Sequence, residues 1–194
     1  FGTVREVGPK DRKNMPTRKR IKKKVSKKTV RKSTLNSGHS PLALAYDLGG
    51  TKVVVGVVDS RGFVLSQTHE NLDFNTGEKE VLNHLTALGK KHLQDYPAIR
   101  RVGIASAGPL DPKKGILLDA TNFKTNGKSW GVVPIVQRLE RGLKRPVVLE
   151  NDAAAAVLAE AWIGSAKHSK NIVMLTLGTG LGLGVICNGA LLRG

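Results

Sequence analysis

Three short segments of the sequence carry residue types that suit phosphate and proton chemistry. The first, Asp47-Leu48-Gly49-Gly50-Thr51-Lys52, combines a carboxylate, a glycine pair, a hydroxyl and an amine. Glycines let backbone N–H groups approach phosphate oxygens without a Cβ in the way, and an aspartate can hold a hydrated Mg²⁺. The order Thr51-Lys52 differs from that of a P-loop, where Lys comes first. The segment is therefore a polyphosphate-binding turn or simply the turn of a β-hairpin.

The second segment, Gly178-Thr179-Gly180-Leu181-Gly182, is also flanked by apolar runs, at residues 171–177 and 183–187. Runs of this length and composition are typical of strands. A Rossmann fingerprint does not fit, because Leu183 stands where that pattern needs its third glycine. The chain therefore contains two hairpins of the same kind, each with a turn of glycine and threonine.

The third segment, Glu150-Asn151-Asp152-Ala153, follows an apolar strand and begins an alanine-rich helix. An aspartate at such a place is usually an N-cap that accepts a hydrogen bond from a free backbone N–H group. The helix dipole also keeps its carboxylate ionised, and a fixed carboxylate can accept the proton of a hydroxyl that attacks a γ-phosphate. Asp152 is thus a candidate cap and a candidate general base.

The elements around these segments follow a regular order. We expect strands at residues 42–46, 52–59, 63–68, 99–106, 146–149, 171–177 and 183–187, and helices at 77–95, 132–143 and 153–163. On the first helix, one stripe consists of Val81, Leu82, Leu85, Leu88 and His92. This order resembles that of an actin-like ATPase (ribonuclease-H-like) domain. The resemblance implies an α/β fold with a mixed sheet and helices on both faces. The predicted domains are a basic tail at residues 1–40, an actin-like kinase domain at 41–168, and the first hairpin of a truncated second domain at 169–194.

The positive charge of the chain is concentrated at its beginning. The formal net charge is +17, and residues 1–41 hold 14 of the 32 Lys and Arg side chains but only 2 of the 15 Asp and Glu. Residues 1–40 lack the apolar content that ordering requires, so we predict disorder there. The tail is an electrostatic tether to nucleic acid or acidic lipid, or a solvated extension.

Cysteine, histidine and hydropathy give weaker guidance. The single cysteine, Cys187, cannot form an internal disulfide and is predicted to be a buried core thiol. No apolar run of about 18 residues indicates a membrane span, so a cytoplasmic protein fits best. The five histidines lack metal-ligand spacing, and we expect His84 and His92 to be at the surface or partly buried.

Five motifs in order resemble the ROK family, which contains bacterial sugar kinases and sugar-responsive repressors. The motifs are DLGGTK at 47–52, GIASAGPLD at 103–111, TNF at 121–123 followed by Trp130, PVVLENDAAAA at 146–156, and TLGTGLGLG at 176–184. The resemblance covers residues 42–194. Two departures are mild, since Ala107 and Ala154 replace residues that the family often has as Pro and Asn.

The resemblance implies a role for each motif. Asp152 is the expected catalytic base, and the sugar pocket is expected to include Gly108, Pro109, Thr121, Asn122 and Asn151. ATP is expected at Asp47, Gly49, Gly50, Thr51, Lys52, Thr176, Gly178, Thr179, Gly180 and Gly182, with Mg²⁺ held through water by Asp47. The family's Glu-x-Gly-His segment and cysteine-rich loop lie beyond Gly194, so a structural zinc is expected only there.

The implied function is ATP-dependent phosphorylation of a hexose, with glucose as the default substrate and a homodimer as the full-length form. Because parts of the sugar and adenosine sites lie beyond Gly194, we expect this segment alone to be inactive. A sugar-responsive repressor of the same family is an alternative, although residues 1–40 show no helix-turn-helix pattern. A third possibility is an inactive remnant that acts only as a binding module.

Overall fold

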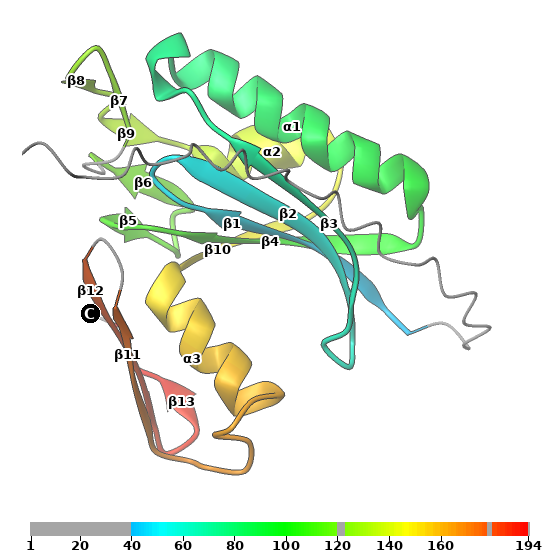
Figure 1. Cartoon of the computed structure of the whole chain (residues 1–194), viewed down its shortest axis with the longest axis vertical. Coiled ribbons are helices and arrows are strands. Elements are labelled where there is room, and N and C mark those ends of the chain that lie inside the picture. Colours follow the sequence, from blue (N-terminus) through cyan, green and yellow to red (C-terminus); the bar gives the residue numbers. More distant parts are fainter. Residues whose placement is uncertain (1–39, 120–122, 178–179, 194) are drawn as a thin grey trace, which may run out of the picture. The chain divides into compact units, whose positions relative to one another are not determined.

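The computed structural model describes residues 40–119, 123–177 and 180–193 of the chain (Figure 1). The predicted disordered tail lies outside these residues except for Ser40, as do four predicted site residues, Thr121, Asn122, Gly178 and Thr179. Within the described part of the chain, no helix is both long and apolar enough to cross a lipid bilayer.

The first sheet has five strands in the order β10-β4-β1-β2-β3. They are β1 Leu42–Leu48, β2 Lys52–Asp59, β3 Val64–Asn71, β4 Ile99–Ser106 and β10 Val147–Asn151. Strands β10, β4 and β1 run parallel to one another, whereas β2 and β3 are joined antiparallel by hairpin turns. The predicted mixed sheet is confirmed, and each predicted strand of this sheet is present within a few residues.

Two helices close the core of this sheet. They are α1 Glu78–Asp95 and α2 Ile135–Leu143, which lie together beside the sheet in Figure 1. The predicted apolar stripe of α1 is confirmed, and His92 at its end is only 4% exposed, so the expectation of a surface or partly buried His92 was wrong. It is buried because it follows Leu88 by one helical turn on the core-facing side. Tyr46 of β1 donates a hydrogen bond to the Leu85 carbonyl at 3.0 Å.

The second helix begins three residues later than predicted. Val132 and Val133 form β9 (Val132–Val133), and Pro134 is the N-cap of α2. The residue before a proline is disfavoured in helical conformation, so Val133 stays extended. Strand β9 then pairs with β6 Ile116–Leu118, which pairs with β5 Leu110–Asp111.

A small aromatic cluster anchors the connection between these strands and the core. The short helix η2 Phe74–Thr76 places Phe74 against Phe123 and Trp130, with ring centroids 5.2 and 5.5 Å away. Trp130 also donates to Thr125 Oγ1 at 2.7 Å, beside the hairpin of β7 Lys124–Thr125 and β8 Lys128–Ser129. Trp130 is therefore a packing residue.

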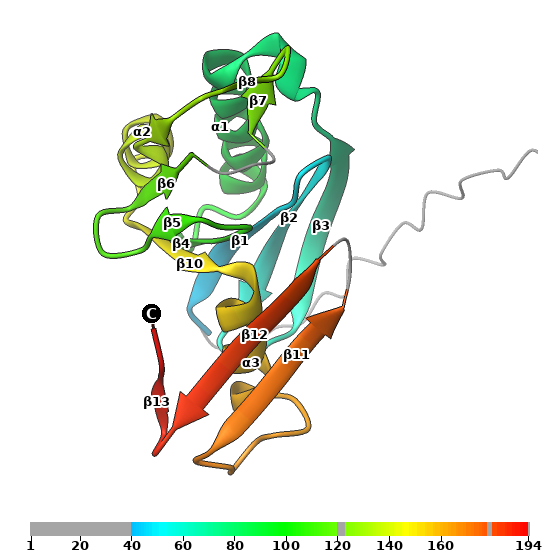
Figure 2. The same cartoon turned by 90° about the vertical axis from the view of Figure 1, so that its left-hand side faces the viewer.

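The second sheet consists of β11 Ile172–Leu177, β12 Leu181–Cys187 and β13 Ala190–Leu191. Helix α3 Asp152–Trp162 packs against β11 and β12, as Figure 2 shows. The predicted boundary between residues 168 and 169 thus separates elements that pack together, and the domain division stays a prediction. Cys187 is exposed rather than buried as predicted, because its side of β12 faces away from α3.

Candidate active site

The candidate site forms where three parallel strands end at the same edge of the first sheet. In the strand register, Asp47 of β1 aligns with Ala105 of β4, which aligns with Glu150 of β10. Neighbouring strands are about 4.8 Å apart, so the ends of β1 and β10 lie roughly 10 Å apart on either side of β4. Ligands in open α/β sheets bind outside such carboxyl ends.

Asp152 is the first residue of α3, directly after the end of β10. The N-cap is Asn151 and not Asp152, because it is the Asn151 Oδ1 atom that accepts from the N–H groups of Ala153 and Ala154, at 3.0 and 3.2 Å. Asp152 Oδ1 accepts from Ala153 N at 2.8 Å. Among the described residues, Asp152 Oδ2 has no hydrogen-bond partner, and the side chain is exposed. One oxygen is thus held in place while the other can accept a proton.

The two hydrogen bonds that cap α3 also determine the orientation of the Asn151 side-chain amide. Because its Oδ1 accepts two backbone hydrogen bonds, its Nδ2 is directed away from the helix. A Cβ placed on Gly108 would lie 3.8 Å from this nitrogen, so the loop that begins at Gly108 passes close to it. Asn151 can therefore donate a hydrogen bond to a ligand oxygen between β10 and this loop.

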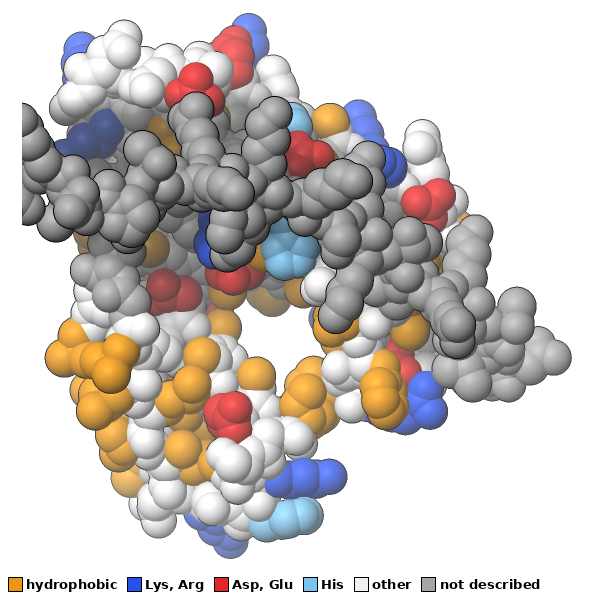
Figure 3. Space-filling view, viewed as in Figure 1, with side chains coloured by type: hydrophobic (Ala, Val, Ile, Leu, Met, Phe, Trp, Pro, Cys, Tyr) orange, Lys and Arg blue, Asp and Glu red, His pale blue; other side chains and the backbone are white. Residues whose placement is uncertain are grey.

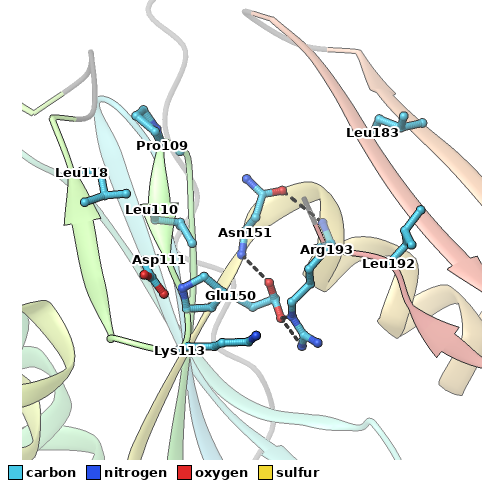
Figure 4. A pocket seen from close by; sticks show the side chains of 13 residues that line it. Pro109, Leu110, Asp111, Lys113, Leu118, Glu150, Asn151, Leu183, Leu192 and Arg193 are labelled. Carbon is cyan, nitrogen blue, oxygen red and sulfur yellow. Dashed lines mark hydrogen bonds and ion pairs between the residues drawn. The ribbon is translucent and has the colours of Figure 1, made fainter.

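A cavity of about 610 Å³ opens beside these residues (Figure 4). Figure 4 shows Pro109, Leu110, Asp111, Lys113 and Leu118 on one side, Leu183 and Leu192 on the other, and Glu150, Asn151 and Arg193 between them. Gly108, Pro112 and Ala154 complete the lining. The cavity brings together three predicted sugar-binding residues, Gly108, Pro109 and Asn151. Its lining combines apolar side chains with several charged and polar ones, Asp111, Lys113, Glu150, Asn151 and Arg193, which suits a ligand rich in hydroxyl groups.

Sequence reasoning missed several residues of this cavity. Asp111 lay inside a recognised motif but was not assigned to the site. Its carboxylate accepts a hydrogen bond from the Lys114 backbone N–H at 3.0 Å, and this bond lowers the pKa of the carboxyl group. Glu150 could have been singled out as the neighbour of Asn151. Leu192 and Arg193 had no local signal, because only the pairing of β13 with β12 brings them here.

The turn of the first hairpin, between β1 and β2, lies at the same edge of the first sheet, because it follows the carboxyl end of β1. The Gly49 N–H donates to the Lys52 carbonyl at 3.0 Å, which closes the turn between β1 and β2. Asp47, Thr51 and Lys52 are exposed there. Their backbone and side-chain groups are available to a phosphate-bearing ligand.

The second hairpin uses its glycines in two ways. A Cβ on Gly182 would overlap Thr176 Oγ1 and lie 3.0 Å from Ala153 Cβ, so this glycine permits close packing on the start of α3. At Gly180, by contrast, no atom lies within 4 Å of an added Cβ. Gly180 is exposed, directly before β12. The ATP-binding roles of Thr176, Gly180 and Gly182 stay predictions.

The described residues fit a hydrated magnesium ion better than a metal enclosed by protein. Within the described ranges, no three His, Cys, Asp or Glu side chains lie close enough to hold a metal together. Mg²⁺ commonly keeps several waters and binds through one or two carboxylates plus substrate phosphates. Asp47, an exposed oxygen donor at the sheet edge, suits that mode.

The family follows from comparison with known proteins. The sequence profile of the ROK family matches residues 43–194. The chain belongs to the ROK family. A glucokinase from Thermotoga maritima is 37% identical to this chain over 153 residues, which are 78% of this chain and 46% of that protein. This ROK chain therefore spans about half the length of the curated relatives that it matches.

Solved structures agree on the fold. A ROK family glucokinase from Streptomyces griseus in complex with glucose and AMPPNP has a TM-score of 0.68 at 32% identity, covering 79% of this chain and 46% of that one. The predicted actin-like ATPase fold is thereby confirmed. A ROK family transcriptional regulator, a homologue of the E. coli MLC protein, has a TM-score of 0.69 at 23% identity, covering 80% of this chain and 39% of that one. This second likeness supports the fold alone.

Proposed function

We propose that this chain is part of an ATP-dependent sugar kinase that phosphorylates a hydroxyl of a hexose, with glucose as the default substrate. The observation that carries the proposal is the geometry of Asp152. One of its oxygens is held by the Ala153 N–H while the other is open, and the preceding residue, Asn151, lines the cavity, although Asp152 itself does not. The likeness to a glucokinase bound to glucose and AMPPNP supports the choice of both ligands.

In the proposed reaction, Asn151 donates to a sugar hydroxyl and the loop at Gly108 and Pro109 closes one side of the sugar. Thr121 and Asn122, which lie outside the described residues, are proposed to complete that side. The attacking hydroxyl oxygen forms a bond to the γ-phosphorus while the bond from this phosphorus to the bridging oxygen of ADP breaks. Asp152 Oδ2 takes the proton of the hydroxyl.

The two hairpins are proposed to hold the phosphates of ATP. Gly49, Gly50, Thr51 and Lys52 act from the first sheet, and Thr176 with the turn at residues 178–182 acts from the second. A magnesium ion held through water by Asp47 would screen the phosphate charge. Backbone N–H groups in both turns stabilise the charge that shifts toward the leaving oxygen.

The test is the variant Asp152→Asn in the full-length protein. General base catalysis contributes about 100- to 10,000-fold to such rates, so we expect hexose-dependent ADP release to fall by that factor while ATP binding is retained. Asp73→Asn is the matched control, because Asp73 only caps the short helix at Phe74. Retained activity in Asp152→Asn would exclude the proposed base.

The other functions considered from the sequence predict different results. A binding module would bind glucose without any ADP release from the full-length protein. A repressor would bind duplex DNA with sequence preference, and no contact in the described residues favours that function. We propose a homodimer for the full-length protein, which sedimentation velocity would test.

A further inference from the structure

Glu150 connects two parts of the site that belong to different sheets. It stands directly before Asn151, and its side chain is 17% exposed. Its Oε1 atom accepts from the backbone N–H of Asn151 at 3.1 Å. Its Oε2 atom accepts from Arg193 Nε and Nη2 at 3.1 and 2.7 Å. One carboxylate thus joins the end of β10 to a residue 43 positions later.

Arg193 is itself fixed to the second sheet. The Leu192 N–H donates to the Val185 carbonyl of β12 at 2.9 Å, one residue before Arg193. Leu191 of β13 is paired with Ile186 of β12. The guanidinium is a planar fork, and its two hydrogen bonds to one oxygen of Glu150 fix its orientation there, while the backbone beside it is tied to β12.

Asn151 continues the connection into the candidate catalytic residues. Its backbone N–H is held by Glu150, and its side chain caps the helix that Asp152 begins. A displacement of Arg193 therefore changes the acceptor that holds Asn151, and with it the start of α3. Figure 4 shows Glu150 between Asn151 and Arg193, with both of its interactions drawn.

From this geometry we propose that the Glu150–Arg193 ion pair is a latch that holds Asn151 and Asp152 in a fixed position relative to the second sheet. Both members of the latch are positioning residues. Strand β12 begins directly after the glycine turn assigned to ATP, so the latch couples the nucleotide side of the site to the sugar side. The effect on sugar binding rests on the proposed function, whereas the attachment of the second sheet to β10 does not.

The latch is tested by amide hydrogen exchange and glucose titration on the 194-residue chain. Arg193→Met removes the guanidinium, Arg193→Lys keeps the charge but not the fork, and Glu150→Gln removes the negative charge. Glu150→Gln is needed because Lys113 extends from the opposite wall toward the pair and could replace Arg193 (Figure 4). The matched control is Arg61→Met, which removes an ion pair of similar length, 2.8 Å to Asp59, from within the hairpin of β2 and β3.

We expect Arg193→Met and Glu150→Gln each to speed exchange of the Asn151 and Leu192 amides by about tenfold, the size of one charge-assisted hydrogen bond. The double variant should add little to either single one, because both remove the same interaction. Arg193→Lys should restore part of the protection and part of the glucose affinity, and Arg61→Met should leave both amides unchanged.

The outcomes separate the latch from the sugar site. Wild-type exchange at Asn151 in Arg193→Met, or an equal change in Arg61→Met, would overturn the latch. If no variant binds glucose, including the wild type, the sugar assignment fails for this chain while the exchange rates still decide the latch. Weaker glucose binding in Arg193→Met that Arg193→Lys partly restores would support both.

Discussion

The hairpin of β1 and β2 is buried within its sheet, whereas the hairpin of β11 and β12 is covered on one face only. Leu44, Val53 and Val55 of the first hairpin are 0% exposed. In the second hairpin, Leu175 and Leu177 are 60% and 86% exposed. Figure 3 shows hydrophobic side chains gathered on the surface over β11 and β12. The two hairpins have similar sequences and very different surroundings.

This difference shows that an apolar strand pattern predicts that the strand will be buried, but does not predict which element covers it. In the first hairpin α1, α2 and the neighbouring strands bury the side chains. In the second, α3 covers the face that contains Gly184 and Ile186, and the face with Val173, Leu175 and Leu177 stays open in the part of the chain that the structure describes. The candidate site therefore lies between the first sheet, whose hairpin is buried, and the second sheet, whose hairpin is covered on one face.

The largest effect should separate the two hairpins directly. Leu44→Ala removes a fully buried side chain and is expected to cost about 2–5 kcal/mol in the free energy of unfolding. Leu177→Ala, at a position 86% exposed, should cost less than about 0.5 kcal/mol. Urea unfolding of both variants measures the difference. Similar losses would mean that the outer face of β11 is covered in solution.

A smaller loss of stability is expected when the face of the second hairpin that packs on α3 is disturbed. A Cβ on Gly184 would overlap the Ala153 carbonyl oxygen and lie 2.7 Å from Val157 Cγ1. Gly184→Ala should therefore cost about 1–3 kcal/mol by forcing β12 away from α3. Gly103→Ala is the control, because no atom lies within 4 Å of its added Cβ. Thermal unfolding should show a lower Tm for Gly184→Ala only, and an unchanged Tm there would argue against this packing.

The closed core also predicts a dependence of stability on pH. Burial lowers the pKa of His92 below its ordinary value of 6.5, although Asp95 acts in the opposite direction. The unfolded chain therefore takes up a proton at higher pH than the folded chain does. The contribution of neutral His92 to the free energy of unfolding is therefore full above about pH 6.5, and it is lost as the pH falls from there toward the lowered pKa. His92→Gln removes this titration.

The measurement is the urea midpoint of the wild type and of His92→Gln at pH 7.5 and pH 5.5. The wild type should lose more stability between these two conditions than the variant does. Equal losses would show that His92 titrates alike in the folded and unfolded chains. His92 lies in α1, which covers the first sheet, and its effect is expected to be smaller than those of the two packing variants.

The sequence predicted the elements well where local patterns determine them. Both hairpins and the stripe of α1 were evident from the apolar pattern, and Asn151 of the third segment lines the cavity. The predicted start of α2 failed because the apolar run at Val132 outweighed the restriction that Pro134 imposes. The pattern around Cys187 predicted burial, but which face of β12 is covered depends on α3, a tertiary fact.

The candidate site was predictable in its motifs and not in its connections. Asn151 was expected to contact sugar, yet its second task as the cap of α3 depends on which of two neighbouring polar residues adopts the extended conformation. The ion pair of Glu150 and Arg193 joins residues far apart in sequence, and only the pairing of β13 with β12 reveals it. Long-range polar contacts of this kind have no signature in a single sequence.

The most direct test of the central claim, that sugar binds at the shared edge of β1, β4 and β10, is a glucose titration of the isotopically labelled full-length protein followed by amide chemical shifts. At about 10 mM glucose, ten times the upper end of common KM values, we predict shifts at Gly108, Leu110, Asn151 and Ala154 and none in β3. Shifts confined to residues away from this edge, or no shifts at all, would contradict the account.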